Sequence, residues 1–271
     1  MYKYYVPFYY LILSRLKSNI DRVSWIIIFI IPPFIIGFSY SKIDFSEYIF
    51  IFILANLAFY SLYEIGYLEN DIQTTKKEKN PTIRIKDEDY NYLNTNYFKV
   101  ISIKYIMTLF LVTLLFFVIE DNLMVVAFIF ILFVSRIFFY LHNFFRNRVN
   151  ILTFFILAVT KYIMILFLLM PFNELFVPIL LSILIFPLLR TIEHSSRKKY
   201  NLIKYSKIIG NHDLFRLKYY IFLIIVSLFF GNKLMSIILG YFFFFRLFSY
   251  LLIRKKIYKR DDLKTKDIRE G

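Results

Sequence analysis

Long apolar stretches constrain the fold of this 271-residue chain more than any other feature of its sequence. A helix needs ~20 consecutive apolar residues to cross the ~30 Å hydrocarbon core of a bilayer, and several stretches approach that length. Hydrophobic residues make up 59% of the chain, as expected for a protein embedded in lipid. We therefore predict an all-α fold, a polytopic transmembrane helical bundle of about eight spans. The expected spans are 24–40, 46–67, 98–119, 122–139, 150–170, 174–190, 214–230 and 232–253.

The Lys and Arg residues alternate between rich and poor loops along the chain. The rich segments hold 28 of the 34 and are the N-terminal segment, the 68–97, 136–149 and 190–218 loops, and the C-terminal tail. The other turns carry only Lys42 and Lys233. Because basic loops stay on the cytoplasmic side, we expect an integral protein of the cytoplasmic (inner) membrane with both termini in the cytoplasm. The net charge of +15 then reflects contact with a lipid bilayer, not with nucleic acid.

The chain divides into three expected parts. Residues 1–23 mix apolar and charged positions and predict an interfacial amphipathic segment. Residues 24–253 form the transmembrane helical domain, and residues 254–271 form a basic cytoplasmic tail. The sequence has no Cys, which excludes thiolate nucleophiles, iron–sulfur clusters and Cys-zinc sites. We expect kinks at the four prolines that lie inside spans, Pro32, Pro33, Pro178 and Pro187.

A polar run at 70–84 follows the second expected span and brings acids, an amide, hydroxyls and cations to the boundary between membrane and water. Mg²⁺ takes hard oxygen ligands, usually one or two carboxylates together with the phosphate oxygens of a substrate. If the helix continues through the run, Asn70, Thr74 and Glu78 share one face and Asp71 lies beside them. The run therefore predicts a site that holds Mg²⁺ against a diphosphate, although a solvated charged loop fits the same pattern.

Cationic side chains suited to phosphate gather in the loops expected on the same side. Lys79 and Arg84 follow the first run and would donate hydrogen bonds to phosphate. A group near residue 142 contributes His142. The 190–218 loop is expected to form the opposite wall of a diphosphate site with one carboxylate and three cations, Glu193, Arg197, Lys198 and Lys199. An ordinary basic loop is the alternative interpretation of that cluster.

Ionisable residues inside the expected spans carry further information. Lys161 lies well inside its span, where an unpaired charge costs several kcal/mol and usually faces a cavity. Glu64 is the expected partner of Lys161, and we expect both to face a cavity that opens near Asp71 and Glu193. Arg136 lies toward the end of its span, where it either reaches the headgroups or binds phosphate.

The polar run at the end of the second span resembles the first motif of the UbiA superfamily of intramembrane prenyltransferases. That family is all-helical and carries N-D-x-x-D-x-x-x-D after its second span and D-x-x-x-D after its sixth. The run here reads Asn70-Asp71-Ile72-Gln73-Thr74-Thr75-Lys76-Lys77-Glu78, with Thr74 and Glu78 at the positions of the later two Asp residues. The continuation Asn80-Pro81-Thr82-Ile83-Arg84 resembles the H-P-T-K-R sequence of the polyprenyl-phosphate phosphoribosyltransferase branch. Glu193 through Lys198 stand where the second motif is expected, without its Asp pair.

The resemblance implies that the 24–253 domain is a Mg²⁺-dependent transferase that moves a polyprenyl group from its diphosphate to an acceptor. The expected partners are a polyprenyl lipid and a diphosphate-containing donor. The expected catalytic residues are Asp71, Glu78 and Lys161, and the expected metal ligands are Asn70, Asp71, Glu78 and Glu193. The expected substrate-binding residues are Asn70, Thr74, Lys79, Arg84, Arg136, His142, Glu193, Arg197, Lys198 and Lys199.

Three other functions fit parts of the sequence. Phosphoribosyl transfer from phosphoribosyl diphosphate to polyprenyl phosphate also releases diphosphate. A non-catalytic relative would serve as a membrane scaffold. A transporter of an anionic solute would account for the charged residues inside the spans.

The charge pattern yields a topology that reporter fusions test. A reporter inserted at Asp121 or Glu174 should lie outside the cytoplasm, and one at Lys76 should lie inside it, because basic loops are retained. A single introduced cysteine can serve as the reporter, and its labelling by a membrane-impermeant reagent is measured, since the chain has no Cys of its own. The opposite labelling pattern would contradict the predicted orientation.

Overall fold

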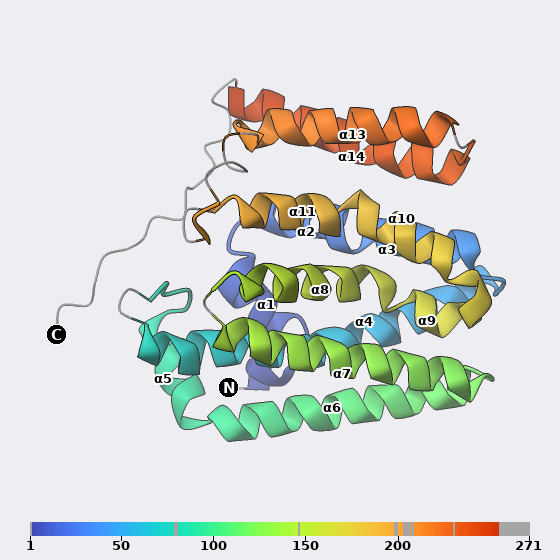
Figure 1. Cartoon of the computed structure of the whole chain (residues 1–271). Coiled ribbons are helices and arrows are strands. Elements are labelled where there is room, and N and C mark those ends of the chain that lie inside the picture. The colour runs from blue at the N-terminus through green and yellow to red at the C-terminus, as the bar shows by residue number, and fades with distance from the viewer. Residues whose placement is uncertain are drawn as a thin grey trace. The chain divides into compact units, whose positions relative to one another are not determined.

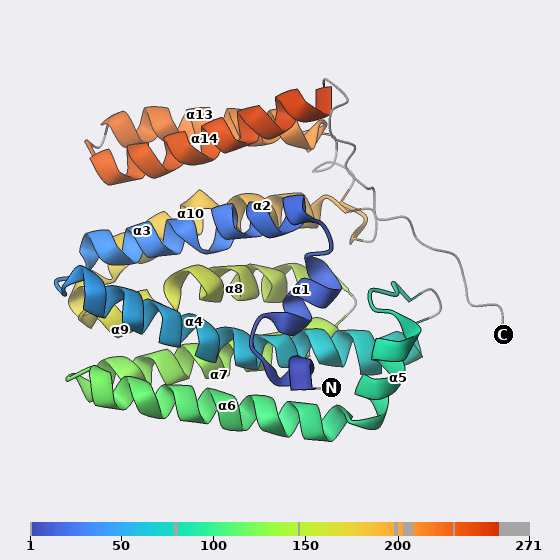
Figure 2. The same ribbon diagram turned by 180° about the vertical axis from the view of Figure 1, so that it is seen from behind.

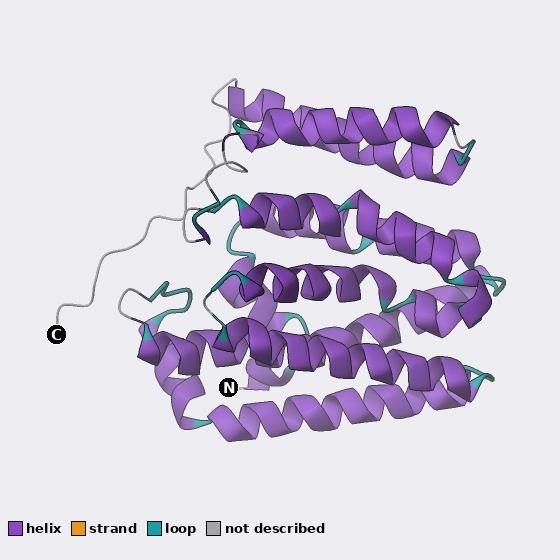
Figure 3. Ribbon diagram, in the orientation of Figure 1, coloured by secondary structure: helices purple, strands orange, loops and turns teal. Residues whose placement is uncertain are grey.

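Every regular element in the described residues of the computed structural model is a helix, which confirms the all-α prediction (Figures 1 and 3). The structure describes residues 2–78, 81–145, 147–197, 200–202, 207, 209–229 and 231–254. The chain forms two compact units, the first within Met1–Ile179 and the second within Leu180–Thr265. The predicted 254–271 tail lies outside the described residues except for Arg254.

Six helical segments in the described residues are long and apolar enough to cross a membrane. These segments are Asn19–Tyr40, Phe45–Lys77, Tyr97–Val118, Asn122–Phe144, Val149–Leu169 and Lys233–Arg254. A seventh is obtained if the bent pair Phe176–Ile185 and Pro187–Ser195 forms one span. A polytopic membrane protein is therefore supported, and the count of eight spans stays a prediction.

The first unit is built around α4 (Phe45–Leu68), the most enclosed of the candidate spans. α6 (Tyr97–Val118) and α7 (Asn122–Phe144) pack against α4, and α7 also packs against α8 (Val149–Ile163). The span Asn19–Tyr40 consists of α2 (Asn19–Phe29) and α3 (Ile31–Tyr40), with Pro32 and Pro33 in the first turn of α3. The kink expected at these two prolines stays a prediction. The short α9 (Leu166–Leu169) and the single turn η4 (Phe172–Glu174) complete the unit.

Small residues on α4 let its neighbours approach closely. A Cβ added at Gly66 would lie 2.2 Å from Cγ of Phe139 on α7, so only glycine fits there. Asn143, one turn further along α7, donates a hydrogen bond of 2.9 Å to the carbonyl oxygen of Gly66. Close backbone approach at small residues is a common way for membrane helices to associate, because water expulsion contributes little there.

The end of α4 changes its helical geometry where the polar run begins. Residues Glu69–Thr74 form the π-helical turn η2, and Thr75–Lys77 form the tighter turn η3. Glu78 then adopts extended backbone angles. The single α-helical face expected for Asn70, Thr74 and Glu78 is therefore interrupted, because a π turn contains one more residue than an α turn.

The N-terminal residues pack on this end of α4. The turn η1 (Tyr2–Tyr5) and helix α1 (Tyr9–Arg15) lie across α4, and α5 (Asp87–Thr95) contributes to the same apolar cluster (Figure 2). Tyr10 is fully buried in that cluster. The start of the expected interfacial segment 1–23 is thus integrated into the helical core of the unit.

The second unit contains α11 (Pro187–Ser195) and the helical hairpin of α13 (His212–Phe229) and α14 (Lys233–Arg254). α10 (Phe176–Ile185) leads into it from the first unit. A 42° bend separates α10 from α11 and confirms the kink expected at Pro187. The hydroxyls of Tyr219 and Tyr220 on α13 donate to the carbonyl oxygens that this bend exposes, those of Leu184 and Ile185.

The packing at Gly66 gives a stability prediction. We expect Gly66→Ala to lower the thermal midpoint of the detergent-purified protein by several degrees, because the added methyl displaces Phe139 at a cost of about 1–3 kcal/mol. Gly240→Ala is the matched control, since nothing lies within 4 Å of its added Cβ and a helix gains about 1 kcal/mol from the change. Equal midpoints for the two variants would contradict this packing.

Candidate functional site

Asp71 is the hub of the polar cluster at the end of α4. Its buried carboxylate accepts two hydrogen bonds from Arg15, of 2.8 and 3.1 Å, and one of 3.1 Å from Arg84. The hydroxyl of Tyr10 donates to it at 2.9 Å, and the Asn70 side chain at 3.1 Å. Both carboxylate oxygens are therefore engaged, and two guanidinium groups share one negative charge.

Three chain segments create this arrangement. α1 carries Tyr10 and Arg15, η2 carries Asp71, and the extended segment after Pro81 returns Arg84 to the end of α4. The three charged groups sum to +1. Burial, followed by the neighbouring charge of Arg15, lowers the pKa of the Arg84 guanidinium below its usual value. The Asp71 carboxylate is thus paired with two cations in a half-buried position, and the charge of Glu78 also acts on Arg84.

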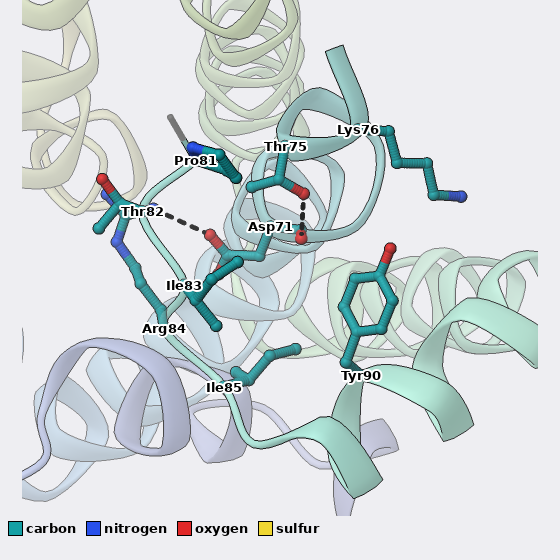
Figure 4. Close-up of a pocket in the computed structure, with 9 residues that line it drawn as sticks. All are labelled: Asp71, Thr75, Lys76, Pro81, Thr82, Ile83, Arg84, Ile85 and Tyr90. Atoms are coloured by element: carbon teal, nitrogen blue, oxygen red, sulfur yellow. Dashed lines mark hydrogen bonds and ion pairs between the residues drawn. The ribbon is translucent and has the colours of Figure 1, made fainter. Parts of the chain in front are cut away.

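A small pocket of about 170 Å³ opens beside this cluster. Figure 4 shows the nine residues that line it, and they are Asp71, Thr75, Lys76, Pro81, Thr82, Ile83, Arg84, Ile85 and Tyr90. The Lys76 side chain points away from Asp71 and donates to Asn94 at 2.8 Å. Arg84 is the arginine among the residues that line the pocket, and Thr82 and Tyr90 are lining residues that carry hydroxyls. Such a site suits a small anionic group.

The residues predicted to bind Mg²⁺ do not form a donor set that fits a resident cation. Asn70 donates to Asp71, and the oxygens of Asp71 face two arginines that would repel a divalent ion. Glu78 lies on the extended segment beyond the helical turns, and its charge acts on Arg84. The described residues contain no cluster of three or more acidic or His side chains suited to a metal. The magnesium site stays a prediction, and no catalytic step is assigned to a metal.

Glu64 does not pair with Lys161, and this expectation was wrong. The Glu64 carboxylate instead accepts from Nζ of Lys104 on α6 at 2.6 Å, with both side chains fully buried. Its other oxygen accepts from the backbone N–H of Leu11 on α1 at 2.6 Å. One acidic side chain therefore joins three helices in the interior of the unit.

Lys161 on α8 lies among aromatic rings. Its Nζ is 4.4 Å from the ring centre of Tyr63 and 4.9 Å from that of Phe29. The hydroxyl of Tyr67 is 3.5 Å away. Arg15 lies over the same Tyr67 ring, with its Cζ 4.6 Å from the ring centre. Tyr67 thus connects Lys161 to the Asp71 cluster.

The remaining predicted residues of the first unit have structural partners. Arg136 pairs with Glu69 on η2 and donates to the hydroxyl of Tyr105 at 2.9 Å. His142 forms a 3.0 Å hydrogen bond with Thr153 on α8. Thr74 donates to the carbonyl oxygen of Glu69 at 3.3 Å. Of the predicted set, the structure therefore brings Asn70, Asp71 and Arg84 into direct contact.

The second unit has its own ion-pair cluster at Glu193. Arg216 on α13 forms a two-point contact with this buried carboxylate, and Arg190 donates to it at 2.8 Å. Arg197 is exposed near the end of α11. Lys79, Lys198 and Lys199 lie outside the described residues. The expected convergence of Glu193 with Asp71 stays a prediction because the two residues belong to different units.

Sequence reasoning missed several partners that organise the first unit. Lys104 is an ionisable residue inside an apolar span, as Lys161 is, so the sequence could have identified it as a functional or ion-paired residue. Glu69 immediately precedes the motif and gave no separate signal. Tyr10 and Arg15 were assigned to the membrane surface, since no local pattern predicts that α1 folds back onto α4.

Comparison of the chain with protein-family models, curated proteins and solved structures found no match.

The buried pair of Glu64 and Lys104 is open to a double-mutant test. Lys104→Met leaves a buried carboxylate unpaired, so we expect it to cost about 3–5 kcal/mol and to lower the yield of folded protein. Glu64→Gln combined with Lys104→Met should recover most of the loss, because Gln still accepts the Leu11 N–H and no charge remains. Thermal unfolding of the single and double variants measures the coupling. Additive losses would show that the two side chains do not interact.

Proposed function

We propose that this chain is an integral-membrane transferase of the UbiA type, which binds the diphosphate of a polyprenyl diphosphate and transfers the polyprenyl group to an acceptor. The observation that carries the proposal is the pocket at the end of α4, where Arg84 and Asp71 stand at the polar end of a long apolar span. The position agrees with that of the motif Asn70–Arg84 in the sequence.

The size of the pocket supports an anionic headgroup as the bound moiety. Sites for whole drug-sized ligands usually measure ~300–1,000 Å³, and this one is about 170 Å³. A diphosphate would enter it while the attached apolar chain remains in the lipid or between the helices. Such a division matches a pocket at the end of a membrane-spanning helix.

The Arg84 guanidinium has further N–H groups that can donate hydrogen bonds to a diphosphate. Within the described part of the chain it gives one N–H to Asp71, and a guanidinium carries five. In the transfer step, the bond between the first prenyl carbon and the diphosphate oxygen breaks, and its electron pair leaves with the diphosphate. The acceptor forms a new bond to that carbon and loses a proton. Arg84 would stabilise the charge that develops on the departing diphosphate.

The basic loops place this pocket on the cytoplasmic side in our proposal. The 68–97 loop belongs to the Lys- and Arg-rich set, and an eight-span topology puts both termini on the same side. The donor would then be drawn from the cytoplasmic leaflet of the inner membrane.

A non-catalytic membrane scaffold is the second candidate function. The observation that favours it is that the acids at both motif positions, Asp71 and Glu193, are occupied by arginine side chains. Acids held in this way stabilise a fold without needing a substrate. Turnover decides between the two functions.

The test is diphosphate release by purified protein in two mixtures, each with and without Mg²⁺. One mixture contains a labelled polyprenyl diphosphate and aromatic acceptors, and the other contains phosphoribosyl diphosphate and polyprenyl phosphate. We expect release in the first mixture. Release only in the second would assign the phosphoribosyl reaction, and release in neither would favour the scaffold.

Arg84→Gln should lower the rate at least tenfold, mainly through a higher KM for the donor, since a charge-assisted contact contributes about 1.5–3 kcal/mol. Lys42→Gln is the matched control because it removes one positive charge before the opposite end of α4, where Lys42 pairs with Glu174. We expect that variant to stay within twofold of the unmodified protein. Equal losses in the two variants would contradict the assignment of the pocket.

A further inference from the structure

We propose that Lys161, Tyr67 and Arg15 form a second anion subsite, which binds the anionic phosphate of a membrane lipid. The subsite is distinct from the pocket at Arg84 and lies among the helices of the first unit. The inference goes beyond the proposed transferase function, because binding at Lys161 is measurable whether or not diphosphate is turned over.

Lys161 is a cationic side chain within a candidate membrane span. The residue lies within the candidate span Val149–Leu169 and is only half-exposed. No carboxylate in the described residues forms an ion pair with it, because Lys104 occupies Glu64 and two arginines occupy Asp71. Its contacts are the hydroxyl of Tyr67 and the rings of Tyr63 and Phe29.

The free-energy cost of placing Lys161 in a span exceeds what its aromatic contacts recover. A lysine inside a membrane span costs up to about 2.5–3.5 kcal/mol. Lys161 lies near the polar end of α4, within reach of lipid headgroups, because its contact Tyr67 precedes Asp71 by four residues. A cation over an aromatic ring recovers about 0.5–2 kcal/mol, and a long contact with a neutral hydroxyl adds little. The positive charge of Lys161 is therefore not balanced by an acidic side chain among the described residues. An anionic ligand provides the missing compensation.

The groups around Tyr67 indicate the chemistry of that ligand. Arg15 lies over the Tyr67 ring while Lys161 approaches the Tyr67 hydroxyl, so two cations flank one phenol. Tyr67 can donate its hydroxyl proton to an oxyanion between them. The surrounding Phe29 and Tyr63 rings are apolar and favour a ligand with an apolar tail. A lipid phosphate combines these properties, whereas inorganic phosphate has no apolar tail to pack against the rings.

The only tryptophan of the chain reports on this subsite. The ring of Trp25 packs 6.1 Å from that of Phe29, which lies beneath the Lys161 ammonium, and 5.3 Å from that of Tyr60. A ligand that settles on Lys161 changes the surroundings of Phe29 and hence the emission of Trp25. Intrinsic fluorescence therefore measures binding without a label.

The experiment uses the full chain in nanodiscs of phosphatidylcholine, which has no net charge. Trp25 emission is followed while a polyprenyl monophosphate, phosphatidylglycerol or inorganic phosphate is added. We expect a saturable change with at least one of the two lipids and none with inorganic phosphate. A response to phosphatidylglycerol alone identifies a bilayer lipid as the ligand, and a response to the polyprenyl compound alone identifies an isoprenoid. The absence of a saturable change with both lipids overturns the proposal.

Two substitutions separate binding from folding. Lys161→Met should weaken lipid binding at least tenfold while leaving the thermal midpoint unchanged or higher, because it removes an uncompensated charge. Lys161→Arg should retain binding. A Lys161→Met variant that binds lipid normally, or that unfolds while Lys161→Arg does not rescue binding, overturns the proposal.

Arg84→Gln distinguishes this subsite from the pocket of the proposed function. We expect it to lower diphosphate turnover at least tenfold, as above, without changing the lipid response of Trp25. If no turnover is found in any mixture but the lipid response depends on Lys161, the transferase proposal fails and the subsite remains. If Arg84→Gln removes the lipid response as strongly as Lys161→Met, a separate subsite is refuted.

Discussion

Three carboxylates near the end of α4 are each paired with a cation from another part of the chain. These ion pairs determine where the neighbouring helices of the first unit pack against α4. Glu64 takes Lys104 from α6, Glu69 takes Arg136 from α7, and Asp71 takes arginines from α1 and from the segment after Pro81. An unpaired carboxylate in an apolar bundle is costly, so each pair fixes one neighbour at one height along α4. Apolar contacts between membrane helices tolerate sliding, whereas an ion pair has few acceptable positions.

The same pairing determines what the candidate site offers a ligand. The site was expected to bind a metal through its acids, but two arginines occupy the Asp71 carboxylate and bring positive charge to it. A group with its own negative charge suits this environment better than a cation does. Lys161 adds a positive group that lacks an acidic partner in the described residues, and its aromatic surroundings link it through Tyr67 to the same cluster. The polar interior of the unit is therefore biased toward anions.

The helical class was predictable because a bilayer forces any backbone within it to satisfy its own hydrogen bonds. The kink at Pro187 and the position of the polar run after the second span were also readable, since each depends on a few adjacent residues. The partner of Glu64 was not predictable from the sequence, because the choice between Lys104 and Lys161 depends on which helices are neighbours. Asp71 was identified, but Arg15 lies 56 positions away from it, and no local pattern indicates that contact. The π turn at Glu69–Thr74 was not predicted from the sequence either. Its extra residue breaks the four-residue spacing that was expected to bring Asn70, Thr74 and Glu78 onto one helix face.

The contacts of α1 have a consequence for the order in which the protein is assembled during synthesis. α1 leaves the ribosome before α4 and α6, yet the groups that hold it, Glu64 and Asp71, are made about 50 residues later. Glu64 also needs Lys104, which follows after a further 40 positions. α1 therefore cannot make these contacts until α4 and α6 are in place. Its docking follows the synthesis of both partner helices, although α1 itself is made before them.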